Sequence, residues 1–224
     1  MPRAVGPNGP HIEEWPGGLT WIAEPGEPIQ RASHALPGDE GVWLVDPVTA
    51  DGIHTVIENT GDVNGVTVLL DRHTRDATAF ARRYDVSVHV PAVLTDAMDD
   101  LPVPVETFHD ELPDSDYRVR PVVSNRFWRE AALISEDGAI ACVPEAVGTV
   151  PFFRTPAERV GIHPGLRLWP PRRQLRGLDP DRLLVGHGPP VTERAGAALQ
   201  DALAGARRRA PRAFLRMVTS LVHS

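Results

Sequence analysis

The sequence contains no lysine, so all 23 of its basic side chains are arginine. This absence excludes a lysine Schiff base and a phosphate-binding loop of the Walker type, because both need the lysine amine. The arginines remain able to bind a carboxylate or a phosphate through their planar guanidinium groups. The 30 acidic side chains give a net charge of −7, whereas nucleic-acid-binding proteins usually carry a basic surface. We therefore expect no nucleic-acid partner.

Cysteine and long apolar runs are also scarce. The single cysteine, Cys142, excludes an intrachain disulfide and a zinc site built from several thiolates. Its place in an apolar strand favours the core over catalysis. Residues 1–18 lack the apolar stretch of a signal peptide, and no run approaches the roughly 18 apolar residues of a membrane span. We expect a soluble, cytoplasmic protein without a membrane partner, and the sequence does not indicate its oligomeric state.

The composition is otherwise that of a globular domain. With 224 residues and 42% hydrophobic side chains, the chain is long enough for one sizeable core. We expect a single domain over residues 1–224, in which residues 1–17 form a loose start and residues 192–223 form a C-terminal helix. Pro211 is expected to break or kink that helix.

Apolar runs of strand length dominate the first two thirds of the chain. The run at 65–70 is nearly continuous and leads into a helix expected over 76–84. Strands are expected again at 117–123 and on both sides of an Asp137-Gly138 hairpin turn. This order of strands and helices suits two packed sheets with helices outside them.

Four stretches together resemble the metallo-β-lactamase fold, the αββα sandwich of zinc and iron hydrolases. They are GVWLVDP at 41–47, VTVLLDRHTRDATAFA at 66–81, AALISEDGAIACVPEAV at 131–147 and LDPDRLLVGHGPPV at 178–191. They resemble, in turn, an early strand that ends in a carboxylate, the metal loop, a hairpin before a metal-bridging aspartate, and a strand that ends in a ligand histidine. The resemblance covers roughly residues 18–205. It implies a four-layer α/β (α+β) sandwich related to hydrolases.

The metal loop departs from the family's T-H-x-H-x-D-H pattern. With Asp76 on the aspartate position, the three histidine positions hold Arg72, Thr74 and Ala77. His73 falls on a spacer position, so it is not expected to be a ligand. The family's first metal ion is held mainly by three histidines, and the resemblance therefore implies that this ion is lost.

The other landmarks supply the rest of the predicted site. The family's hairpin histidine falls near Arg126, and its bridging aspartate falls near Glu145. His187 matches the last ligand, because it stands in Gly-His-Gly after an apolar strand. Of the family's ligand set, only Asp76, Glu145 and His187 remain.

Charge balance favours a site that works without metal. Two carboxylates left in a deep site must be paired, protonated or hydrated, so we expect Arg72 and Arg126 to take the place of the lost dication beside Asp76 and Glu145. Together with His187, these residues form the predicted ligand-binding site, with no metal cofactor. The chain is then a pseudo-hydrolase, or a weakly active relative, that binds a small anionic molecule or a partner.

Two alternatives remain open. In the first, Asp76, Glu145 and His187 hold one residual Zn, Fe or Mn ion that activates water to cleave an ester, a thioester or a phosphoester. In the second, the chain is a structural or interaction module. The residues also have plainer interpretations, in which Asp76 caps the following helix, His187 is a hydrogen-bonded buried histidine and Glu145 lies on a surface turn.

Overall fold

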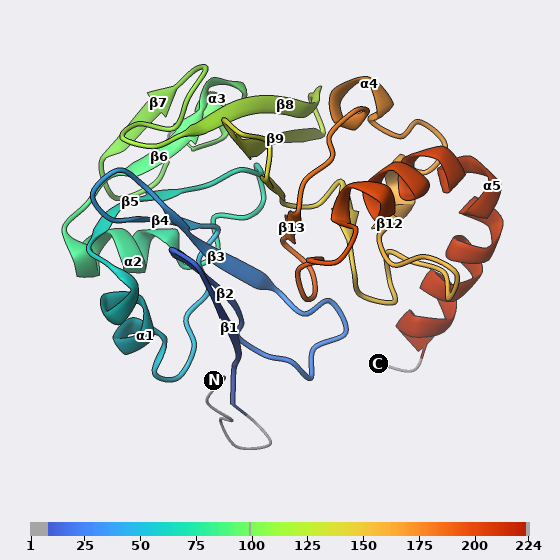
Figure 1. Ribbon diagram of the computed structural model, residues 1–224, viewed down its shortest axis with the longest axis horizontal. Coiled ribbons are helices and arrows are strands. Elements are labelled where there is room, and N and C mark those ends of the chain that lie inside the picture. The colour runs from blue at the N-terminus through green and yellow to red at the C-terminus, as the bar shows by residue number, and fades with distance from the viewer. Residues whose placement is uncertain (1–8, 99, 223–224) are drawn as a thin grey trace.

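Two β-sheets pack face to face, with helices outside both, in a computed structural model that describes residues 9–98 and 100–222 (Figure 1). This arrangement confirms the predicted four-layer sandwich. Among the described residues, no helix is both long and apolar enough to cross a membrane.

The first sheet has seven strands and takes up the N-terminal half of the chain. In spatial order its strands are β1 (His11–Trp15), β2 (Gly18–Ile22), β3 (Ala32–Pro37), β4 (Val42–Val45), β5 (Val63–Thr67), β6 (Val88–Pro91) and β7 (Val105–Phe108). Strands β1 to β4 pair antiparallel, and β4 to β7 pair parallel. Parallel neighbours need crossover connections, which are α1 (Ile53–Thr60), α2 (Ala77–Tyr84) and the short pair η1 (Ala92–Leu94) and α3 (Thr95–Met98).

The second sheet has four strands. Their spatial order is β13 (Arg182–Val185), β10 (Ile140–Val143), β9 (Trp128–Ser135) and β8 (Tyr117–Asn125). Strands β8, β9 and β10 pair antiparallel, whereas β13 runs parallel to β10. The remaining elements are the two-stranded ladder of β11 (Val147–Gly148) and β12 (Gly161–Ile162), η2 (Pro164–Leu166), α4 (Arg172–Leu175) and α5 (Ala195–Val222).

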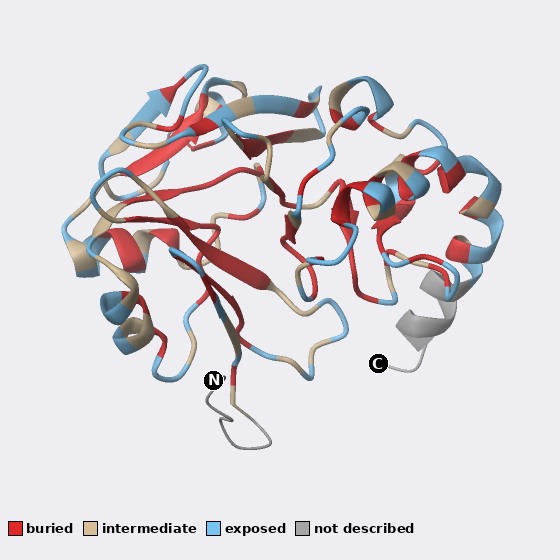
Figure 2. Cartoon of the chain, viewed as in Figure 1, coloured by how far each residue is buried: buried red, intermediate tan, exposed pale blue. Residues whose placement is uncertain are grey.

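The core follows these layers (Figure 2). One apolar cluster lies between α1, α2 and the first sheet, and another lies between α5 and the second sheet. A third cluster lies between the two sheets, where Leu36 and Leu69 meet Leu133, Cys142 and Leu184. Each interface between layers therefore buries its own set of apolar side chains, which is the driving force expected for a sandwich.

The N-terminal segment contains a strand where the sequence predicts a loose start. Residues 1–8 lie outside the described part, but β1 falls within the segment 1–17 that was expected to be loose. The Arg182 guanidinium of the second sheet explains this anchoring, because it bonds Glu13 at 3.0 Å and lies 5.0 Å from the centre of the Trp15 ring. At the other end, α5 is continuous through Pro211, so the expected break does not occur, but the helix bends along its length (Figure 1).

A glycine on β5 lets the two neighbouring strands pack closely. Trp43 on β4 is 1% exposed and lies across Gly65. A Cβ atom added at Gly65 would lie 2.4 Å from the Trp43 ring. Since the indole is fixed in the core, that contact has nowhere to relax.

We predict that Gly65→Ala destabilises the protein by about 1–3 kcal/mol, the usual cost of overpacking a core. The matched control is Gly26→Ala, because a Cβ at Gly26 meets nothing within 4 Å. Urea unfolding of both variants measures the difference. Equal unfolding free energies for the two variants would contradict the close packing at Gly65.

Candidate metal centre

Four functional side chains gather where strands of both sheets end. Asp46 follows β4, and His73 lies in the loop between β5 and α2. Glu145 follows β10, and His187 follows β13. Strand β4 is parallel to β5, and β10 is parallel to β13, so the carboxyl ends of each pair lie at the same edge of their sheet. The four residues thus come from segments far apart in the sequence.

Asp46 fixes the orientation of His73. Asp46 Oδ1 accepts a hydrogen bond from the Leu69 N–H at 3.0 Å, and Oδ2 lies 3.0 Å from His73 Nδ1. Both side chains are buried, with Asp46 2% and His73 6% exposed. Because a carboxylate accepts the hydrogen bond, Nδ1 carries the proton and Nε2 keeps its lone pair.

A backbone carbonyl fixes the orientation of the His187 imidazole in the same way. Its Nδ1 lies 2.8 Å from the Ile29 carbonyl oxygen. A carbonyl can only accept, so the proton again lies on Nδ1 and the lone pair on Nε2. The Phe153 ring stacks on the His187 ring at 5.4 Å and 25°, while the His73 ring lies 5.3 Å away, edge on.

Glu145 completes a group of three. One ligand atom from each of His73, Glu145 and His187 lies within 4.8 Å of the other two, and His73 Nε2 is 3.6 Å from Glu145 Oε2. The turn that carries Glu145 is fixed from below by Glu130, which is 0% exposed. The Glu130 carboxylate accepts hydrogen bonds from the N–H groups of Glu145 and Ala146 at 2.9 and 2.7 Å.

Burial sets the protonation of these groups. It lowers the pKa of His73 to about 4 and that of His187 to about 3, and the nearby Arg75 cation adds to both effects. Burial also raises the pKa of Glu145, against the opposing effect of the Arg72 guanidinium. At neutral pH the site therefore offers two neutral imidazoles whose free lone pairs lie beside a carboxyl group.

Arg75 ties the two sheets together next to this group. Its backbone is left-handed, with φ at 40°. Its guanidinium donates to the carbonyl oxygens of Ala32 at 2.6 Å, Asp46 at 2.9 Å and Gly186 at 3.0 Å. One Arg75 nitrogen also lies 3.5 Å from His73 Nε2. The charged Arg75 guanidinium thus lies next to the group formed by His73, Glu145 and His187, called the metal group below, while it stays bonded to the three carbonyl oxygens.

Arg72 approaches the group from the solvent side. Its Nε lies 3.2 Å from Glu145 Oε2, and its Nη1 lies 3.1 Å from Asp71. The guanidinium carbon lies 4.3 Å from the centre of the Trp128 ring. Because the Arg72 side chain is 41% exposed, it can move away from Glu145, whereas Arg75 cannot.

A buried ion pair holds the loop at 149–169 against the site. The side chains of Glu158 and Arg167 are 0% exposed and 2.9 Å apart, and Arg167 also donates to the Phe153 carbonyl. This loop supplies the Phe153 ring that stacks on His187, and it brings His163 Nε2 to 3.5 Å from Glu145 Oε1. The pair therefore positions the aromatic wall of the site.

The structure brings Arg72, Glu145 and His187 together, as the sequence analysis expected, and Arg72 does pair with Glu145. The other two predicted residues, Asp76 and Arg126, lie outside this group. The Asp76 carboxylate accepts a hydrogen bond from the Thr49 N–H at 2.6 Å, and no side-chain cap bond forms at the start of α2. The exposed Arg126 lies in the turn between β8 and β9, with its guanidinium 4.2 Å from the centre of the Phe127 ring.

His73 is the main correction to the sequence analysis. The family's spacing assigned it to a spacer, but its imidazole faces Glu145 and His187. Asp46 and Arg75 were likewise not assigned to the site. The available signal was Asp46, a carboxylate directly after an apolar strand, since such a group is a typical hydrogen-bond partner for a ligand histidine.

The donor set fits one transition-metal ion. Catalytic zinc keeps three protein ligands and an open position, and two imidazoles with one carboxylate also suit iron or manganese. Tetrahedral ligands at about 2.1 Å from a metal lie roughly 3.4 Å apart, close to the 3.6 Å between His73 and Glu145. Among the described residues, no second group of this kind occurs.

We predict that Arg75→Met lowers the unfolding free energy by about 3–5 kcal/mol, because it removes the hydrogen bonds that a charged group donates to three carbonyl oxygens of both sheets. Arg72→Met is the matched control and should cost about 1 kcal/mol or less, since its ion pair is partly exposed. Chemical unfolding monitored by circular dichroism gives both values. If the two substitutions cost the same, Arg75 does not tie the sheets together.

Stability should fall in mild acid. Fully buried His34 bonds Thr20 and the Val185 carbonyl, and burial lowers its pKa to about 4. An unfolded histidine titrates near 6.5, so from about pH 6.5 down to 4 only the unfolded chain gains this proton. The free energy of unfolding is therefore unaffected by His34 above about pH 6.5. Between there and pH 4, His34 alone lowers it by up to about 3 kcal/mol.

Urea unfolding between pH 7.5 and pH 4.5 tests this expectation. His34→Gln should make the dependence on pH shallower, whereas the same change at exposed His11 should leave it unaltered. Parallel pH profiles for wild type and His34→Gln would show that His34 is not held neutral.

Comparisons with known proteins agree with the fold. No family model matches the chain, and no curated protein matches its sequence. Among solved structures, DIM-1 metallo-β-lactamase is similar with a TM-score of 0.60 and 12% identity over 89% of this chain and 98% of that one.

Two further structures agree. Rubredoxin oxygen:oxidoreductase from Desulfovibrio gigas gives a TM-score of 0.61 and 13% identity over 90% of this chain and 62% of that one. A β-lactamase domain protein from Burkholderia ambifaria gives a TM-score of 0.60 and 16% identity over 92% of this chain and 76% of that one. At these identities the likeness concerns the fold alone, and on that basis the chain has the metallo-β-lactamase fold.

Proposed function

We propose that this protein is a hydrolase that uses one divalent metal ion held by His73, Glu145 and His187. The observation that carries the proposal is the convergence of three ligand atoms within 4.8 Å, with both imidazoles already oriented through Nδ1. Unlike the ligand set inferred from the sequence, this set contains His73 in place of Asp76. When bound, the ion would lower the pKa of a water molecule and so supply a nucleophile at neutral pH.

The protein's own residues have separate tasks around that centre. Asp46 and the Ile29 carbonyl keep the two imidazoles in the tautomer that leaves Nε2 free. Phe153 covers one face of His187 and limits access of bulk water to it. Arg75 provides a fixed positive charge next to His73, which favours an anionic group on the substrate or in the transition state.

Arg72 is the residue best placed to select the substrate. It now pairs with Glu145, and ligation by Glu145 requires the guanidinium to release that oxygen. Once released, the guanidinium still rests on the Trp128 ring at the solvent side of the site. There it can bind a carboxylate or phosphate through two parallel hydrogen bonds. An ester, thioester or phosphoester with an anionic group beside the cleaved bond is therefore the proposed substrate class.

A second candidate function is binding of a small anion without metal, by a catalytically inactive relative. The existing Arg72–Glu145 pair favours it, because a guanidinium already satisfies the carboxylate that a metal ion would need. In that case Arg72 would bind the anion directly.

Metal binding separates the two functions. We predict that the wild type retains up to one equivalent of zinc, iron or manganese after dialysis, and that zinc raises its melting temperature. Zinc at 100 times its dissociation constant stabilises a folded protein by about 2.7 kcal/mol, which is roughly 5–10 °C for a chain of this length. His73→Ala, Glu145→Gln and His187→Ala should each abolish the rise.

Asp76→Asn is the matched control, because the Asp76 carboxylate bonds the Thr49 N–H outside the group. It should keep the response to zinc. A wild type that shows no response to zinc, iron or manganese rules out the metal-dependent function. If inorganic phosphate then raises its melting temperature, and Arg72→Met removes that effect, the second function is supported. Loss of the zinc response in Asp76→Asn would restore the ligand set inferred from the sequence.

A further inference from the structure

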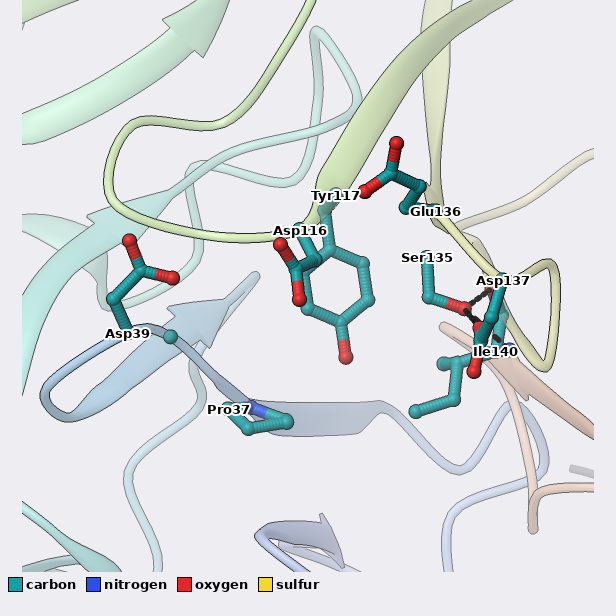
Figure 3. Close-up of a pocket in the computed structure, with 9 residues that line it drawn as sticks. Pro37, Asp39, Asp116, Tyr117, Ser135, Glu136, Asp137 and Ile140 are labelled. Carbon is teal, nitrogen blue, oxygen red and sulfur yellow. Dashed lines mark hydrogen bonds between the residues drawn. The ribbon is translucent and has the colours of Figure 1, made fainter.

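A cavity lies at the opposite end of the sandwich from the metal group formed by His73, Glu145 and His187. It has a volume of about 420 Å³ and is lined by residues 37–39, 116–117, 135–137 and 140 (Figure 3). Ile140, which lines it, is the first residue of β10, whereas Glu145 follows the last residue of the same strand. A ligand here would therefore not touch the metal group. The volume lies within the range of about 300–1,000 Å³ that small-molecule sites occupy.

Backbone hydrogen bonds fix the walls of this cavity. The Asp39 N–H donates to the Asp114 carbonyl at 2.9 Å, and the Glu136 N–H donates to the Asp116 carbonyl at 2.7 Å. These bonds join the turn between β3 and β4 to the segment before β8, and that segment to the turn between β9 and β10. The cavity is thus preformed, so a ligand would lose little binding energy to ordering the walls.

Tyr117 places a polar atom inside the cavity. Its side chain packs in the cluster between the two sheets and the residue is 2% exposed. The hydroxyl group points into the space between Pro37 and Ile140 (Figure 3). None of the hydrogen bonds among the described residues involves this hydroxyl, and its oxygen is not among the fully buried polar atoms, so it is open to the cavity. It is therefore a hydrogen-bonding group aimed at whatever enters the cavity.

The charge of the lining is entirely negative. Asp39, Asp116, Glu136 and Asp137 line the cavity, and no basic side chain does. Glu136 is compensated by Arg118 at 2.9 Å. The Asp137 carboxylate accepts hydrogen bonds from groups of its own hairpin turn.

Two carboxylates remain for a ligand. Within the described part of the chain, the side chains of Asp39 and Asp116 take part in no hydrogen bond or ion pair. Figure 3 shows both on the same side of the cavity as the Tyr117 ring. Their combined charge favours a cation at the position that the Tyr117 hydroxyl reaches.

The lining suits an organic cation better than a metal ion. A bare ion needs several oxygen ligands at about 2–2.6 Å, but among the described residues no three acidic side chains of this lining form a group with metal-binding spacing. The volume is also far larger than one ion needs. Pro37 and Ile140 line the cavity on either side of the Tyr117 hydroxyl (Figure 3), and their apolar surface would suit a short hydrocarbon body.

We propose that this cavity binds a small primary amine in its ammonium form. The ammonium lies beside the carboxylates of Asp39 and Asp116 and donates a hydrogen bond to the Tyr117 hydroxyl, while the apolar body packs on Pro37 and Ile140. The inference is independent of the metal group, because it uses none of the same residues.

The test is a titration of ¹⁵N-labelled full-length protein followed by NMR. The probe is 2-phenylethylammonium, and 2-phenylethanol is its neutral counterpart of similar shape. We expect saturable shifts confined to the cavity lining, with binding of the alcohol at least tenfold weaker. The variant Asp39→Asn/Asp116→Asn should weaken binding of the amine at least tenfold. Tyr117→Phe should weaken it about fivefold, the effect of one lost hydrogen bond.

The matched control changes the same net charge elsewhere. Glu24→Gln/Asp51→Asn alters two exposed residues near the metal end of the first sheet, and it should leave the affinity for the amine unchanged. Equal binding of the alcohol, equal loss in the control variant, or tighter binding of calcium than of the amine at the same lining would each overturn the proposal. The Asp39→Asn/Asp116→Asn variant keeps the test decisive if Tyr117→Phe does not fold.

Discussion

The hydrogen bonds of Asp46 hold the functional end of this protein in place. The residue leaves β4 with φ at 45°, and its carboxylate then bonds both the Leu69 N–H and the His73 imidazole. Its own carbonyl accepts from Arg75 and from the Ser33 hydroxyl. One residue thus sets the end of β4, the start of the metal loop and the tautomer of a ligand histidine. The whole candidate centre depends on this arrangement.

Arg75 and Arg72 supply the positive charge beside the site, which the sequence analysis assigned to Arg72 and Arg126. Arg75 is partly buried and bonds carbonyl groups from both sheets, so it stabilises the fold and gives the site a constant positive charge. Arg72 is half-exposed and has one carboxylate of the site as its partner. The site therefore combines one cation that cannot leave with another that can exchange its partner, and this distinction is invisible in a linear motif.

The layers of the fold could be predicted from the sequence because apolar runs and helix periods are local properties. Glu145 and His187 could be placed for a similar reason, since each directly follows an apolar strand. His73 could not, because its assignment depended on counting residues from Asp76 through a loop whose backbone is left-handed at Arg75. Such a turn changes which side chains point inward without changing their spacing. Arg126 failed similarly, since a hairpin tip carries its side chain away from the strands.

The reactivity of the only cysteine can report how readily the two sheets separate. Cys142 is 1% exposed and lies among the apolar side chains between the two sheets, and burial raises the pKa of its thiol. A thiol reagent can reach it only when the sheets separate or the chain unfolds. Its alkylation rate in native buffer therefore reports the free energy of that opening. With no second thiol in the sequence, the signal comes from a single position between the layers.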